Sequence, residues 1–114
     1  FEKMYAHQYE PILMCRLENG DSRRLNGGVS SNLLQYGRPS GGDRWHDAQK
    51  PRELLAELIT NSTGKRETVL DPFAGSGSTL LAAAAEDRHY IGFEASETYA
   101  DRFTRELREV TGDE

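Results

Sequence analysis

The sequence predicts an α/β fold, and two stretches of the chain carry that prediction. Residues 68–79 begin with the β-formers Val69 and Leu70, turn at an Asp-Pro pair, and pass through a glycine-bearing segment into an alanine-rich stretch of high helix propensity. Residues 89–94 have the composition of a second strand. We therefore expect a strand, a tight loop, a helix and a further strand in succession, which is the arrangement of a ligand-binding βα turn.

Two strands and two polar loops are expected in the first part of the chain. Residues 10–17 are almost continuously apolar, which predicts a strand buried on both faces, with Cys15 as an inert packing thiol. Residues 18–28 are polar and contain glycine, so they predict a loop. Residues 29–36 predict a second short strand, and residues 38–43 a second loop.

A helix is expected to begin at Lys50 and Pro51, with the proline at its first helical position. Four apolar residues recur at helical spacing after it, so we assign them to the core and not to a cofactor site. These residues are Leu54, Leu55, Leu58 and Ile59.

Two more helices follow. Ser78 or Thr79 is expected to cap the alanine-rich helix. The last helix, at about residues 97–110, carries Tyr99 and Phe103 on one apolar face and charged residues elsewhere. That charged face predicts a helix with one side in solvent.

The glycine loop has the chemistry of a nucleoside site. Gly75 and Gly77 remove side chains where backbone must approach a ligand, and the helix behind them offers unpaired N–H groups. Glu94 follows Asp71 by 23 positions, about the spacing at which a carboxylate on the next strand reaches ribose hydroxyls. The third glycine of a dinucleotide fingerprint would fall at Leu80, which argues against NAD.

Charge is unevenly distributed in a chain of 114 residues with net charge −5. Residues 16–52 hold seven Lys or Arg against four Asp or Glu, whereas residues 53–114 are strongly acidic. The basic segment suits a face that meets a polyanion, and the alternative is that its arginines only keep loops soluble. No apolar run could span a membrane and no signal pattern is present, so we expect a soluble, cytoplasmic protein. His46 has no partner at metal-ligand spacing, so no metal site is expected.

Three segments resemble one enzyme family. The string Asp-Pro-Phe-Ala-Gly-Ser-Gly-Ser-Thr at 71–79 closely resembles the S-adenosylmethionine (SAM) loop of the amino-directed DNA methyltransferases, which methylate adenine N6 or cytosine N4. His-Asp-Ala-Gln-Lys-Pro at 46–51 resembles the second SAM-contacting segment, and it precedes the glycine loop as in the β-type members of the family. Tyr-Glu-Pro-Ile-Leu at 9–13 is similar to an earlier strand of those enzymes. The resemblance implies a Rossmann-like SAM-dependent methyltransferase fold, present here in part, as the C-terminal portion of its sheet.

The resemblance also implies roles for individual residues. The basic loops of residues 1–44 would face DNA, and the SAM-binding segments would occupy residues 45–114, all within one methyltransferase domain. The residues expected to bind SAM are His46, Gln49, Lys50, Pro51, Asp71, Pro72, Phe73, Ala74, Gly75, Ser76, Gly77, Ser78, Thr79 and Glu94. The residues expected to contact DNA phosphates are Arg23, Arg24, Arg38 and Arg44.

No catalytic residue is assigned. In the resembled family a tetrapeptide, Asp or Ser followed by Pro-Pro-Tyr, directs the flipped base toward the methyl group, and none of the four prolines of this chain is adjacent to another. We therefore expect the chain to be the SAM-binding portion of the enzyme, inactive alone, with an N-terminal half or a second chain supplying that tetrapeptide. Two alternatives remain: a non-catalytic SAM-binding or DNA-associated remnant, and a small-molecule methyltransferase or nucleotide oxidoreductase on a similar turn.

Overall fold

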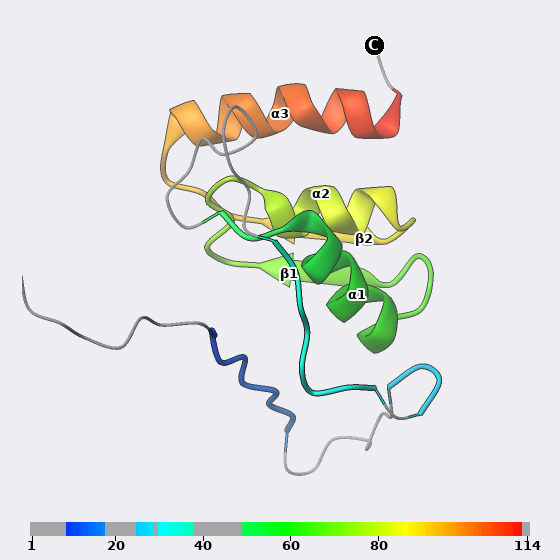
Figure 1. The fold of residues 1–114 in the computed structure, drawn as a ribbon. Helices are drawn as coiled ribbons and strands as arrows, with labels where there is room; N and C mark the ends of the chain where they lie inside the picture. The colour runs from blue at the N-terminus through cyan, green and yellow to red at the C-terminus, as the bar shows by residue number, and fades with distance from the viewer. Residues whose placement is uncertain (1–8, 18–24, 29, 38–48, 113–114) are drawn as a thin grey trace, which may run out of the picture.

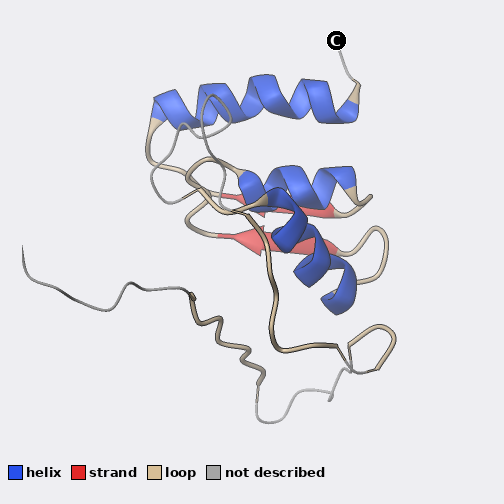
Figure 2. Ribbon diagram, viewed as in Figure 1, coloured by secondary structure: helices blue, strands red, loops and turns tan. Residues whose placement is uncertain are grey.

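The structure, a computed structural model, describes residues 9–17, 25–28, 30–37 and 49–112. Three helices and two strands alternate along the second half of the chain (Figure 1). They are α1 (Arg52–Ser62), β1 (Thr68–Asp71), α2 (Ser78–Ala85), β2 (His89–Gly92) and α3 (Glu97–Thr111). Figure 2 shows the same elements by type, with the two strands side by side, α2 next to them and α3 beyond α2. The predicted α/β succession from residue 50 onward is therefore confirmed.

The two strands form a parallel pair. Thr68 lies opposite His89, and Leu70 lies opposite Ile91. Parallel strands need a crossover between them, and α2 supplies it. The sequence predicted β2 to continue to residue 94, but the ladder ends at Gly92, after which the chain turns to meet the glycine loop.

Helix α2 is the centre of the packing, because it contacts both other helices and both strands. Leu81 is 1% exposed and Ala83 is fully buried. Ala82 and Ala83 form a buried cluster with Ile59 of α1. Val69 of β1 and Tyr90 of β2 pack against this cluster from the sheet. Burying a leucine side chain stabilises a fold by about 1.5–3 kcal/mol. Because few apolar side chains are buried among the described residues, each of them makes a large contribution to the stability of the fold.

The opposite face of the strands is uncovered among the described residues. Side chains alternate along a strand, so the residues that flank Val69 and Tyr90 point away from α2. Leu70 and Ile91 are 62% and 51% exposed, and Phe93, just beyond β2, is also exposed. Of the helices described, none is long and apolar enough to cross a membrane.

Arg88 clamps the C-terminal ends of two helices. Its guanidinium donates to the Thr63 hydroxyl (Nε to Oγ1, 3.0 Å) and carbonyl (2.7 Å) at the end of α1, and to the Glu86 carbonyl (2.7 Å) at the end of α2. The last carbonyls of a helix lack intrahelical partners and carry partial negative charge, so one cation satisfies both ends. Asn26 adds to the cap of α1, since its side-chain amide donates to the Thr60 and Thr63 carbonyls.

Two strand predictions are wrong for the residues that the structure describes. Residues 10–17 and 30–36 form neither strand nor helix. Leu13 and Leu17 are 88% and 83% exposed, and Cys15, expected as a buried packing thiol, is exposed as well. A strand is completed by hydrogen bonds to a neighbouring strand, and the described part of the chain supplies no neighbour for either segment.

Two helix-end predictions need smaller corrections. Pro51 is the N-cap of α1, one position before the first helical residue. Helix α2 begins at Ser78 with Gly77 as its N-cap, so neither Ser78 nor Thr79 caps it, and no side chain does. Glycine takes that place because the cap residue has a φ of 77°, in the left-handed region.

Candidate cofactor-binding site

The glycine loop joins β1 to α2 in a tight turn. Asp71 stands at the carboxyl end of β1, where its Oδ1 accepts a hydrogen bond from the Phe73 backbone N–H at 3.0 Å. The Gly77 N–H donates to the Ala74 carbonyl at 2.7 Å, which closes the turn. A Cβ on Gly77 would lie 2.3 Å from Cδ2 of Phe103, so the Phe103 ring packs directly on the loop backbone.

The end of β2 fastens the loop from the other side. The Ala74 N–H donates to the Phe93 carbonyl at 2.9 Å. One carboxylate oxygen of Glu94 accepts from the Gly75 N–H at 2.6 Å, and the other accepts from the Ser96 N–H at 2.9 Å. Glu94 therefore joins the glycine loop to the segment that leads into α3, in addition to any role toward a ligand.

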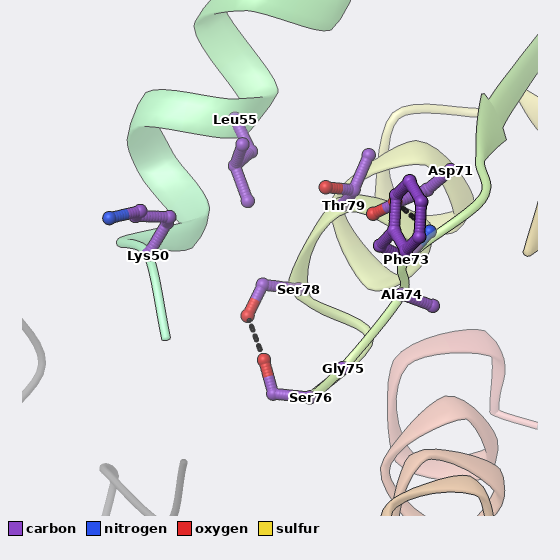
Figure 3. A pocket seen from close by; sticks show the side chains of 9 residues that line it. All are labelled: Lys50, Leu55, Asp71, Phe73, Ala74, Gly75, Ser76, Ser78 and Thr79. Atoms are coloured by element: carbon purple, nitrogen blue, oxygen red, sulfur yellow. Dashed lines mark hydrogen bonds between the residues drawn. The ribbon is translucent and has the colours of Figure 1, made fainter. Parts of the chain in front are cut away.

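A pocket of about 140 Å³ opens between the glycine loop and the start of α1 (Figure 3). Figure 3 shows the loop side chains on one wall, and Lys50 and Leu55 on the other. Its lining residues are Lys50, Leu55, Asp71, Phe73, Ala74, Gly75, Ser76, Ser78 and Thr79.

The loop wall of the pocket combines hydroxyls, a carboxylate and an aromatic ring. Ser76 and Ser78 are both 6% exposed and share a hydrogen bond of 2.8 Å between their Oγ atoms. One hydroxyl of such a pair donates to the other, so the second keeps its own proton for another acceptor. Phe73 is 88% exposed beside them, which is unusual for a large aromatic side chain and leaves its ring available for contact.

The opposite wall presents a lysine whose charge is already paired. Lys50 Nζ lies 2.6 Å from Oε2 of Glu10, and both side chains are about half exposed. In Figure 3 the Lys50 amino group points away from the glycine loop, so the aliphatic part of the side chain borders the pocket. Pairing with a ligand would require the ammonium to leave Glu10, which costs little for an exposed ion pair.

The predicted SAM-binding residues fall into three groups. Those that line the pocket are Lys50, Asp71, Phe73, Ala74, Gly75, Ser76, Ser78 and Thr79. Gln49, Pro51, Pro72 and Gly77 lie next to lining residues in the same segments, and Glu94, which follows β2, contacts the loop at Gly75. His46 lies outside the described residues, as do the four arginines assigned to DNA, Arg23, Arg24, Arg38 and Arg44.

Leu55 is a lining residue that the sequence analysis assigned to the core alone. It packs against the buried cluster and also borders the pocket. Its sequence position could have indicated this second role. Leu55 lies in the first turn of α1, five residues after Lys50, so a pocket that Lys50 borders is within its reach. Within the described ranges, no three His, Cys, Asp or Glu side chains are grouped as metal ligands would be.

Comparison with known proteins identifies the family. The model of the N6/N4 DNA methylase family matches residues 21–105. The chain belongs to this DNA methylase family. The matched region includes the glycine loop, the Lys50 segment and most of α3, so the whole pocket falls within the family match.

Two relatives of the chain are type II methyltransferases by name. It is 50% identical to M.HindIII of Haemophilus influenzae over 64 residues, which is 56% of this chain and 21% of that protein. It is 42% identical to M2.MboI of Moraxella bovis over 105 residues, 92% of this chain and 37% of that protein. The chain thus spans between a fifth and two-fifths of the length of these two relatives.

Solved structures support the fold of the chain. A complex of M1.HpyAVI with SAM superposes with a TM-score of 0.57 at 32% identity, covering 69% of this chain and 42% of that chain. TTHA0409 of Thermus thermophilus, complexed with SAM, gives a TM-score of 0.53 at 34% identity, covering 56% of this chain and 27% of that chain. The expected Rossmann-like methyltransferase fold is confirmed, with part of it present in this chain.

Proposed function

We propose that this chain forms the SAM pocket of a DNA methyltransferase that modifies the exocyclic amine of adenine (N6) or cytosine (N4). The observation that carries the proposal is the pocket itself, which is lined by the family's glycine loop on one wall and by Lys50 on the other. Two similar structures are complexes with SAM, which supports the same ligand here.

The donors and acceptors of the pocket fit one end of SAM. The methionine part of SAM has an ammonium, a carboxylate and a sulfonium, and the pocket offers a carboxylate, hydroxyls and a lysine close by. Ligand pockets usually measure about 300–1,000 Å³, so a pocket of about 140 Å³ accommodates part of SAM and leaves the rest to lie along exposed residues such as Phe73.

In this proposal each residue binds or orients the cofactor. When bound, SAM supplies an activated methyl group on a sulfonium. Asp71 attracts the ammonium of the ligand, and Ser76 with Ser78 donates to its carboxylate. Glu94, already fixed by the Gly75 N–H, accepts from ribose hydroxyls with the remaining capacity of its oxygens. Phe73 covers the apolar part of the ligand and keeps water from it.

Calorimetry with SAM tests the pocket. Replacing Glu94 by alanine should weaken SAM binding by about 1.5–3 kcal/mol, since a charged acceptor is lost. NAD should bind more weakly than SAM to the unmodified chain. Equal SAM affinity in the variant would remove Glu94 from the site.

The DNA contacts belong to the proposal as well. Replacing Arg23, Arg24, Arg38 and Arg44 by serine should weaken duplex binding and reduce the slope of log affinity against log salt by about 0.9 for each lost phosphate contact. SAM binding should stay the same. If the slope of log affinity against log salt is unchanged, these arginines do not contact DNA phosphates and only keep their loops soluble.

Methyl transfer requires a segment that this chain does not contain. The chain has four prolines, none adjacent, so it lacks the Pro-Pro-Tyr sequence that directs the target amine in the family. A second candidate is a SAM-binding remnant that acts with another chain. Transfer of labelled methyl from SAM to unmethylated DNA should require added protein that carries the tetrapeptide, either fused or separate. If such protein restores activity, the chain is part of an enzyme; if SAM binds and no addition restores activity, the remnant is favoured.

A further inference from the structure

The two walls of the pocket come from separate parts of the chain, and α3 contacts both. The glycine-loop wall meets α3 at Gly77, where the Phe103 ring lies against the backbone. Phe103 is itself fixed by an edge-to-face contact with Tyr90 of β2, with ring centroids 6.4 Å apart and planes at 82°. This wall therefore has a rigid support on α3.

The Lys50 wall meets the same helix three residues further on. Arg52, the first residue of α1, forms an ion pair with Oε2 of Glu106, and Oε1 of Glu106 lies 3.3 Å from Nε of Arg102. Residues three apart on a helix lie on one face, so Phe103 and Glu106 present one surface of α3 to both walls. Glu106 is the better shielded partner, since its side chain is 19% exposed against 41% for Arg52.

The other described packing of α1 lies further along the helix. Leu55 and Ile59 join the buried cluster with α2, one and two turns after Arg52. The N-terminal end of α1, next to Lys50, is the end that borders the pocket. The ion pair with Glu106 therefore ties this end of α1 to α3, in addition to the packing of Leu55.

We infer that Glu106 is a positioning residue for the cofactor: through Arg52 it holds the Lys50 wall at a fixed separation from the glycine loop, which Phe103 supports on the same face of α3. The inference rests on the proposed SAM pocket. An exposed ion pair with no such role would affect stability slightly and leave ligand affinity unchanged.

The test measures SAM affinity by calorimetry on the 114-residue chain, at a temperature where circular dichroism shows each variant to be folded. Glu106→Gln keeps the shape of the side chain and removes its charge, and we expect SAM to bind about fivefold more weakly. Glu109→Gln, at an exposed position of the same helix, makes the same charge change and should bind SAM as the unmodified chain does.

A double change separates positioning from a general effect on the helix. Arg52→Gln should weaken SAM binding about as much as Glu106→Gln, and the two changes together should weaken it no further, because both remove the same ion pair. Equal affinity in Glu106→Gln and Glu109→Gln, or additive losses in the double variant, would overturn the inference. If the unmodified chain itself does not bind SAM, the proposed function fails and the inference fails with it.

Discussion

Replacing Gly77 by alanine tests how tightly α3 supports the glycine loop. The structure gives this change two separate costs. The backbone at Gly77 has a φ of 77°, where an alanine Cβ costs about 1–2 kcal/mol. The new Cβ would also lie 2.3 Å from Cδ2 of Phe103, and inserting a methyl group into a packed site costs about 1–3 kcal/mol. Together these costs predict a loss of about 3 kcal/mol in the free energy of unfolding, because Tyr90 restricts the retreat of the ring.

Two other glycines provide matched controls. Gly112 ends α3 with a φ of 73° and has nothing within 4 Å of an added Cβ, so Gly112→Ala carries the backbone cost alone, about 1 kcal/mol. Gly92 has no positive φ, but its Cβ would lie 2.3 Å from Cδ1 of Leu80. The tip of Leu80 is flexible, so Gly92→Ala should cost about 1–2 kcal/mol from crowding alone.

Urea unfolding followed by circular dichroism measures all three variants, and a double change completes the test. Phe103→Leu should remove most of the crowding, so Gly77→Ala made in that background should cost about 1 kcal/mol less than in the original chain. If Gly77→Ala is no more destabilising than Gly112→Ala, the Phe103 ring does not press on the loop, and the support described for this wall of the pocket is wrong.

Three further changes have defined outcomes. Arg88→Met removes the hydrogen bonds of the clamp at the ends of α1 and α2, so the free energy of unfolding should fall by about 2 kcal/mol and the Tm by about 10 °C. A Tm shift under about 2 °C would show that these hydrogen bonds do not stabilise the fold. Glu94→Ala removes the acceptor of the Gly75 amide, whose hydrogen exchange should quicken about tenfold; unchanged protection would show that the bond is not formed in solution. A hydrogen bond to Glu57, with smaller contributions from burial and nearby carboxylates, raises the pKa of Tyr36 above its ordinary value of 10.0, so Glu57→Gln should lower that pKa in carbon NMR titrations. Because the pKa of Tyr36 is raised in the folded protein, the hydrogen bond to Glu57 stabilises the fold below pH 10, and this stabilisation is lost as the pH rises through the raised pKa. Equal Tyr36 pKa values in the variant and the unmodified protein would exclude Glu57 as the cause.

The second half of the fold could be predicted because its signals are local. An Asp-Pro turn, two glycines and an alanine run specify a strand end, a loop and a helix without reference to the rest of the chain. For this reason β1, α2, β2 and α3 lie within about two residues of their predicted positions. The lining of the pocket by the glycine loop followed from the same local pattern.

The remaining features depend on contacts between distant residues. The apolar run of residues 10–17 has the composition of a strand, but a strand also needs a neighbour, and composition carries no information about pairing. The same limit applies to Leu55, whose helical stripe predicted burial but not the pocket it borders. The contacts of α3 with Gly77 and Arg52 likewise join positions separated by more than 20 residues, and no spacing rule connects them.

The clamp at Arg88 has an electrostatic consequence at the far ends of the helices it joins. Because α1 and α2 meet at their C-termini, their N-termini both lie at the pocket, beside Lys50 and Ser78. Each N-terminus carries the equivalent of about half a positive charge, and Arg88 offsets the negative poles at the other end. The pocket therefore has a positive side formed by two helix dipoles and a negative side formed by Asp71, within a chain whose net charge is −5. Such a bipolar field favours a ligand end that bears both signs of charge, as an amino acid does, over a pyrophosphate, whose charges all have one sign.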